Sequence, residues 1–103
     1  MLLKVCDGQC GGGPVFWLDA GLHPREWIGP AVLSSLAQYL ARQRESPVVR
    51  YFDWYILLMA NPDGYLETWE GDRQWRKNKN QEDFLKCRRR NIPAIGSGVD
   101  LNR

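Results

Sequence analysis

The chain has 103 residues, of which 44% are apolar and 25% charged, as expected for one small soluble domain. A net charge of +2 is too small to indicate a nucleic-acid partner. No apolar run approaches the roughly 20 residues of a membrane span. The opening "MLLKVCDGQC" also lacks the apolar segment of a signal peptide. We therefore expect neither a nucleic-acid partner nor a membrane-spanning segment.

Three cysteines, Cys6, Cys10 and Cys87, leave one thiol unpaired within the chain. A bridge between Cys6 and Cys10 would close a very tight loop, although the neighbouring glycines give that loop freedom. Three cysteines and one histidine do not match zinc-finger spacing. The disulfide pairing therefore stays open at this point.

The first half of the chain predicts two strands, a helix and a third strand. "LLKV" and "VFWLD" are short apolar runs separated by a glycine-rich turn. A helix follows, with an apolar stripe from Val32 to Leu40. It is expected to begin near 24–27 and to end in polar residues before Pro47, which stops it. "FDWYILLMA" (52–60) then suits a strand buried on both faces. This order predicts an α/β fold, a partial mixed sheet with a crossover helix.

The second half is harder to assign. "NPDG" (61–64) predicts a turn. The residues from Tyr65 to Ser97 predict a long polar loop, and "GVDLNR" predicts a last strand. The basic run at 86–90 suits a solvated loop, with a polyanion contact or a protease-sensitive site as alternatives.

"DAGLHPREWIGPA" holds the chain's single histidine, His23, three residues before Glu26. Both would lie where a strand ends and a helix begins, a position where ligands collect in α/β sheets. An imidazole and a carboxylate at this spacing can reach one zinc ion, but an ordinary strand-to-helix turn has the same residues. Arg25 between them puts a positive charge beside a cation, which favours an anionic substrate. Arg76 and Arg103 are further candidates for binding an anion.

Five stretches together, "VFWLD", "DAGLHPREWIGPA", "NPDGY", "DRQWRKN" and "GVDLNR", resemble the catalytic domain of the zinc metallocarboxypeptidases of the pancreatic A/B-type branch. The resemblance runs from about Leu2 to Arg103 and is weaker at 80–96. It implies a piece of the zinc carboxypeptidase (phosphorylase/hydrolase-like) fold. It also implies Zn²⁺ as cofactor and hydrolysis of the C-terminal peptide bond of peptides and proteins.

The resemblance assigns roles to six residues. His23 and Glu26 would be two of three zinc ligands, and Arg76 would polarise the scissile carbonyl and stabilise the oxyanion. Three residues would bind the substrate. Arg25 would contact the backbone of the substrate, and Asn102 and Arg103 would hold the free carboxylate at its C-terminus. The implied partner is a peptide or protein C-terminus, and the implied protein is a secreted monomer.

The resemblance is incomplete in ways that bear on activity. The family needs a second histidine ligand and a glutamate general base further downstream, and this chain contains no other histidine. We therefore expect residues 1–103 to be the N-terminal part of the catalytic domain, truncated at its C-terminal end and inactive alone. A non-catalytic relative that binds peptide C-termini, or a truncated product without a stable fold, are the alternatives.

Overall fold

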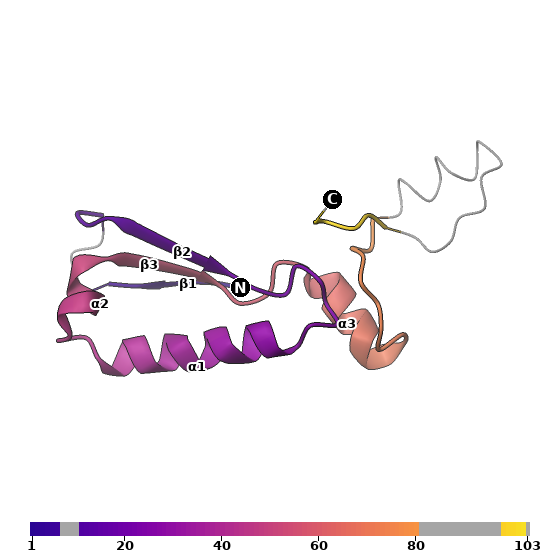
Figure 1. The fold of residues 1–103 in the computed structure, drawn as a ribbon, viewed down its shortest axis with the longest axis horizontal. Helices are drawn as coiled ribbons and strands as arrows, with labels where there is room; N and C mark the ends of the chain where they lie inside the picture. The colour runs from indigo at the N-terminus through magenta and orange to yellow at the C-terminus, as the bar shows by residue number, and fades with distance from the viewer. Residues whose placement is uncertain (7–10, 81–97, 103) are drawn as a thin grey trace. The chain divides into compact units, whose positions relative to one another are not determined.

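Figure 1 shows the computed structural model, which describes residues 1–6, 11–80 and 98–102. The chain divides into two compact units. The first unit comprises Met1–Ala20 with Trp27–Ala60, and the second comprises Gly21–Glu26 with Asn61–Arg103. In the part of the chain that is described, no helix is long and apolar enough to cross a membrane.

The first unit is a three-stranded mixed sheet with the strand order β1-β3-β2. β1 (Leu2–Val5) runs antiparallel to β3 (Asp53–Leu57), and β2 (Val15–Asp19) runs parallel to β3. A parallel pair needs a crossover connection, and α1 (Ile28–Arg42) supplies it between β2 and β3. The predicted partial mixed sheet with a crossover helix is confirmed, as is a strand within 52–60. Burial of this strand on both faces is only partly met, because Tyr55 and Leu57 are half-buried.

The core of this unit lies between the sheet and α1, which runs along one face of the sheet (Figure 1). Two rows of residues across the three strands share that face, because side chains alternate along each strand. The rows are Leu3, Ile56 and Leu18, and Val5, Trp54 and Phe16. The helices complete the core with Leu33, Ala37, Leu40 and Val49. Ile56 is fully buried and occupies the centre of the sheet.

Two helix boundaries differ from the prediction. α1 begins at Ile28, after the expected start at 24–27. A short helix that was not predicted, α2 (Pro47–Tyr51), follows it. Pro47 was expected to stop α1, and it instead opens α2, because the first turn of a helix needs no N–H from proline. α1 itself ends five residues earlier, at Arg42.

The predicted turn at "NPDG" is wrong, because these residues begin the helix of the second unit, α3 (Pro62–Glu70). The Asn61 side chain caps the helix by accepting a hydrogen bond from the Gly64 N–H at 3.0 Å. Asp63 adds a carboxylate to the first turn, where the helix dipole favours it. A Cβ at Gly64 would lie only 2.7–2.8 Å from the Asn61 amide and Pro24 Cγ, so the site requires glycine.

The predicted strand at "GVDLNR" is also wrong for its described residues, since 98–102 form no strand. Gly98 has a φ of +95°, and the following residue pairs with Asn78 instead of a neighbouring strand. Asn78 N–H donates to Val99 O at 3.0 Å, and Val99 N–H donates to Asn78 Oδ1 at 2.8 Å.

Arg103, the basic run at 86–90 and the part of the chain where the resemblance is weaker, 80–96, lie wholly or almost wholly outside the described residues. Cys6 is in a disulfide, and Cys10 and Cys87 also lie outside them.

Candidate metal and substrate site

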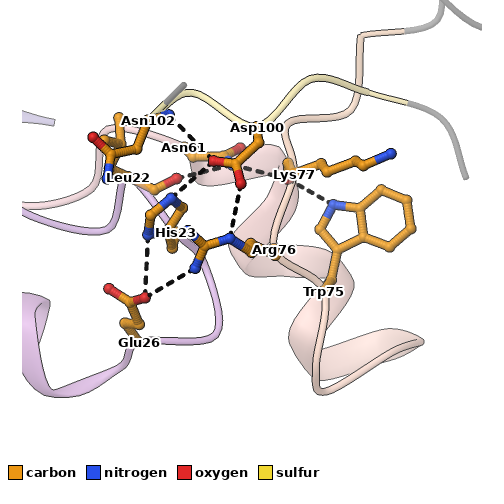
Figure 2. A network of polar contacts seen from close by, with 9 residues as sticks. All are labelled: Leu22, His23, Glu26, Asn61, Trp75, Arg76, Lys77, Asp100 and Asn102. Atoms are coloured by element: carbon orange, nitrogen blue, oxygen red, sulfur yellow. Dashed lines mark hydrogen bonds and ion pairs between the residues drawn. The ribbon is translucent and has the colours of Figure 1, made fainter.

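His23 and Glu26 lie on a tight turn of the second unit, ahead of α1. The turn is closed by a hydrogen bond from the Glu26 N–H to the His23 carbonyl at 3.1 Å. Both side chains leave it on the same side, with Nδ1 of His23 3.1 Å from Oε1 of Glu26 (Figure 2). The imidazole is buried, whereas the Glu26 side chain is 56% exposed. One polar atom of each residue therefore points toward the other.

The second ring nitrogen of His23 is held by Asp100, whose Oδ1 lies 3.0 Å from Nε2. Asp100 was not among the residues identified from the sequence. The two residues are 77 positions apart, and nothing local in "GVDLNR" links its carboxylate to a histidine. The only available signal was that Asp100 is a carboxylate two positions before Asn102, a predicted site residue.

The contacts of His23 constrain its protonation pattern. A neutral imidazole has one N–H, and a carboxylate accepts hydrogen bonds but donates none. If the N–H is on Nε2 and faces Asp100, Nδ1 presents a lone pair toward the Glu26 oxygen. Two such electron-pair donors 3.1 Å apart repel each other unless a proton or a metal cation lies between them. The arrangement is typical of a metal-binding histidine oriented by a carboxylate.

Arg76 joins the same group of side chains. Its Nε donates to Asp100 Oδ2 at 2.9 Å, and its Nη1 lies 3.5 Å from Glu26 Oε1 (Figure 2). The Arg76 guanidinium, with further hydrogen bonds from the Asn102 backbone and His23, holds the pKa of the Asp100 carboxyl well below its usual range. Asp100 is therefore ionised at neutral pH and serves as a fixed acceptor for both His23 and Arg76.

Asn61 connects the two chain segments that carry these residues. Its Nδ2 donates to the carbonyl of Leu22 at 3.3 Å and to that of Lys77 at 3.0 Å. Leu22 precedes His23, and Lys77 follows Arg76, so one buried amide links the backbones beside both side chains. The sequence predicted a turn role for Asn61 and missed this one.

Two further predicted residues, Arg25 and Asn102, lie at the margin of this group. Arg25 is partly exposed, and its carbonyl accepts from Nη1 of Arg73 at 3.1 Å. Asn102 is exposed, and its backbone N–H donates to Asp100 Oδ1 at 3.2 Å. The structure thus brings His23, Glu26 and Arg76 together and ties Asn102 to them through Asp100.

The sequence matches the family of zinc carboxypeptidases over residues 1–103, its whole length. The chain belongs to the zinc carboxypeptidase family. It is 34% identical to carboxypeptidase B2 of Bos taurus over 99% of this chain and 23% of that protein. It is also 32% identical to an inactive metallocarboxypeptidase of Uncinocarpus reesii, over 94% of this chain and 16% of that protein. Among solved structures, the carboxypeptidase A of Helicoverpa armigera matches with a TM-score of 0.75 and 36% identity.

The zinc carboxypeptidase fold predicted for the chain is confirmed by that structural match, which covers 99% of this chain and 24% of the other. This zinc carboxypeptidase chain therefore spans about a quarter or less of the length of the relatives that it matches. The family hydrolyses peptides from their C-terminal end, as its name states.

The family name implies a zinc ion, and the residues present fit part of a zinc site. Two donors at about 2.0–2.2 Å from one tetrahedral ion are about 3.3–3.6 Å apart, close to the 3.1 Å between His23 Nδ1 and Glu26 Oε1. Among the described residues, no group of three or more histidine, cysteine, aspartate or glutamate side chains is arranged to hold a metal. His23 and Glu26 can accordingly supply two protein ligands but not a complete set.

Proposed function

We propose that this chain is the N-terminal part of the catalytic domain of a zinc-dependent metallocarboxypeptidase, which releases the C-terminal residue of peptides by hydrolysis. The observation that carries the proposal is the convergence of His23 Nδ1 and Glu26 Oε1, with Asp100 behind the imidazole. The family match over the whole chain supports it. In this proposal a third ligand and a general base come from other residues of the full-length protein; the chain's 23% share of a relative's length and its single histidine support this.

His23, through Nδ1, and Glu26 would hold the zinc ion. When bound, zinc supplies Lewis acidity and lowers the pKa of a coordinated water toward neutrality. Asp100 would keep a proton on Nε2 of His23, which would fix the tautomer and direct the Nδ1 lone pair toward Glu26. Carboxylates in this position raise the basicity of the histidine ligand.

Arg76 would stabilise the negative charge that develops on the carbonyl oxygen of the scissile peptide. Its Nε is fixed by Asp100, so the guanidinium is oriented before substrate arrives. A donor oriented in advance loses little reorganisation energy, and removing one such donor commonly costs about 10²–10³ in kcat. The 3.5 Å contact between Nη1 and Glu26 supports a position of this guanidinium beside the metal ligands.

Arg25, Asn102 and Arg103 would bind the substrate. Arg25 would contact its backbone, and the other two would pair with its terminal carboxylate, which only a chain end carries. The disulfide of Cys6 supports an extracellular location, since disulfides persist in oxidising compartments. A monomeric full-length protein is part of the same proposal.

The test compares the full-length protein with the 103-residue chain on two matched peptides, one with a free C-terminal carboxylate and one amidated. We expect the full-length protein to release the last residue of the free peptide only, to lose this activity with a zinc chelator, and to lose it on His23→Ala. The 103-residue chain should release nothing. Turnover by the 103-residue chain that disappears on His23→Ala would contradict the incomplete site.

A second candidate function is a non-catalytic protein that binds peptide C-termini. The 32% identity to an inactive metallocarboxypeptidase favours it. In that case the full-length protein binds the free peptide more tightly than the amidated one but releases no residue from it. A histidine and a glutamate downstream of Arg103 at family spacing would decide for the enzyme.

A further inference from the structure

Arg76 lies on a segment, 72–80, that contains no helix or strand. Asp100 fixes the end of its side chain, but that contact does not fix the backbone from which the side chain extends. The position of the guanidinium therefore depends on what holds residues 75–79. Lys77 O and Asn78 make the backbone contacts to Asn61 and Val99 described above.

Trp75 and Arg76 point to opposite sides of this segment, Arg76 toward His23 and Glu26, and Trp75 away from them (Figure 2). The indole Nε1 donates to the Lys77 carbonyl at 2.7 Å, so the ring folds back over its own segment. The Lys79 ammonium lies over the same ring, 4.7 Å from its centroid. A cation in this position is attracted by the face of the indole.

The Lys79 ammonium also binds α3. Its Nζ is 2.7 Å from Oε2 of Glu67, and both side chains are about one-third exposed or less, at 36% and 27%. The other oxygen of Glu67 turns back toward the end of its own helix, where it accepts from the Asp72 N–H at 3.4 Å. A Cβ at Gly71 would collide with this oxygen, so the glycine leaves room for the folded-back carboxylate. One ammonium thus connects a helix side chain to the ring beside Arg76.

We propose that Glu67, Lys79 and Trp75 form a clamp, called here the Lys79 clamp, that positions Arg76. Lys79 links the residue that precedes Arg76 to a rigid helix, and it does so on the face of the segment opposite the candidate site. Among the described residues, the hydrogen bonds, ion pair and ring contact of these three side chains involve neither His23 nor Glu26, so the clamp acts through Arg76. The consequence for catalysis rests on the proposed function, whereas the positioning itself does not.

The geometry of the ion pair between Lys79 and Glu67 differs from that of an ordinary surface ion pair. Exposed pairs are held weakly because water screens them and both side chains lose rotamer freedom. Glu45 and Arg50 provide such a pair in the same chain, at 3.6 Å and with exposed fractions of 95% and 58%. The Lys79 contact is shorter, less exposed and shared with an aromatic ring, which restricts the ammonium further. Glu45→Gln is therefore a matched control for Glu67→Gln.

The first experiment measures solvent exchange of the Arg76 Nε proton by NMR in the 103-residue chain. We expect Glu67→Gln and Lys79→Met each to speed this exchange about two- to fivefold, because the guanidinium leaves Asp100 more often. Lys79→Arg, which keeps both the charge pair and the ring contact, should preserve the wild-type rate, as should Glu45→Gln. Wild-type exchange in both Glu67→Gln and Lys79→Met would overturn the clamp.

The second experiment measures kcat and KM of the full-length protein. Lys79→Met should loosen Arg76 and lower kcat about tenfold, with little change in KM. This loss is smaller than the roughly hundredfold decrease in rate that a misplacement of about 1 Å can cause. Lys79→Arg should rescue kcat. An equal loss in both Lys79 variants would overturn the clamp's role in catalysis. If the wild-type protein hydrolyses nothing, the proposed function fails, and the exchange experiment still decides whether the clamp positions Arg76.

Discussion

Asn61 is the residue whose replacement tests the second unit most sharply, because its side chain makes three hydrogen bonds from a buried position. Loss of the cap at Gly64 costs about 0.5–2 kcal/mol. Loss of the bonds to Leu22 and Lys77 costs about 1 kcal/mol each. We expect Asn61→Ala to lower the free energy of unfolding by about 2–4 kcal/mol.

Asn61→Asp separates the two contributions. A carboxylate still accepts from the Gly64 N–H and suits the helix N-terminus, but it cannot donate to the carbonyls of Leu22 and Lys77. We expect this variant to lower the free energy of unfolding by about 1–3 kcal/mol, mostly through the lost hydrogen bonds to Leu22 and Lys77. Urea unfolding followed by tryptophan fluorescence measures both variants. Wild-type stability in Asn61→Asp would refute the claim that this amide links the His23 and Arg76 segments.

Three further predictions follow from individual contacts. Asp100→Ala removes the acceptor behind the imidazole, and it should weaken Zn²⁺ binding in a competition titration about 10–100-fold; unchanged affinity would contradict that role. Ile56→Ala should lower the free energy of unfolding by about 2–5 kcal/mol because the side chain is fully buried, whereas the exposed Val32→Ala should change it by less than about 0.5; similar losses in urea unfolding would count against the described core. The hydrogen bond from Lys79 lowers the pKa of Glu67 in the folded protein. Wild-type protein should therefore be more stable than Glu67→Gln above about pH 5, and this difference should disappear as the pH falls through the lowered pKa. Unfolding at pH 7 and pH 2 checks this, and a difference that persists at pH 2 would contradict it.

The first unit could be predicted well from the sequence because its signals are local and mutually consistent. The apolar run that contains β3 is largely buried, and α1 has a single apolar stripe. Together these two patterns predict a helix that packs on the sheet as a crossover. The second unit was predicted poorly where one residue type serves two structures. Asn, Pro, Asp and Gly favour turns and also favour helix starts, and only the buried contacts of Asn61 and Gly64 decide between them.

The candidate site was predictable only in part. His23 and Glu26 are three residues apart, so their spacing allowed a shared ion, and the resemblance to the family favoured that interpretation over an ordinary turn. Asp100 acts on His23 across 77 residues, and such a contact depends on tertiary structure. The failure of the strand at 98–102 has the same origin, because Asp100 and the backbone around it are committed to His23, Arg76 and Asn78 rather than to a sheet.

The most direct measurement uses the chain's single histidine, which gives one unambiguous imidazole signal in long-range ¹H–¹⁵N NMR. On titration with Zn²⁺, the Nδ1 resonance of His23 should shift while Nε2 keeps its proton and its contact with Asp100. Glu26→Gln should weaken this response. A zinc-induced loss of the Nε2 proton, or ring resonances that ignore zinc altogether, would contradict a metal site shared by His23 and Glu26.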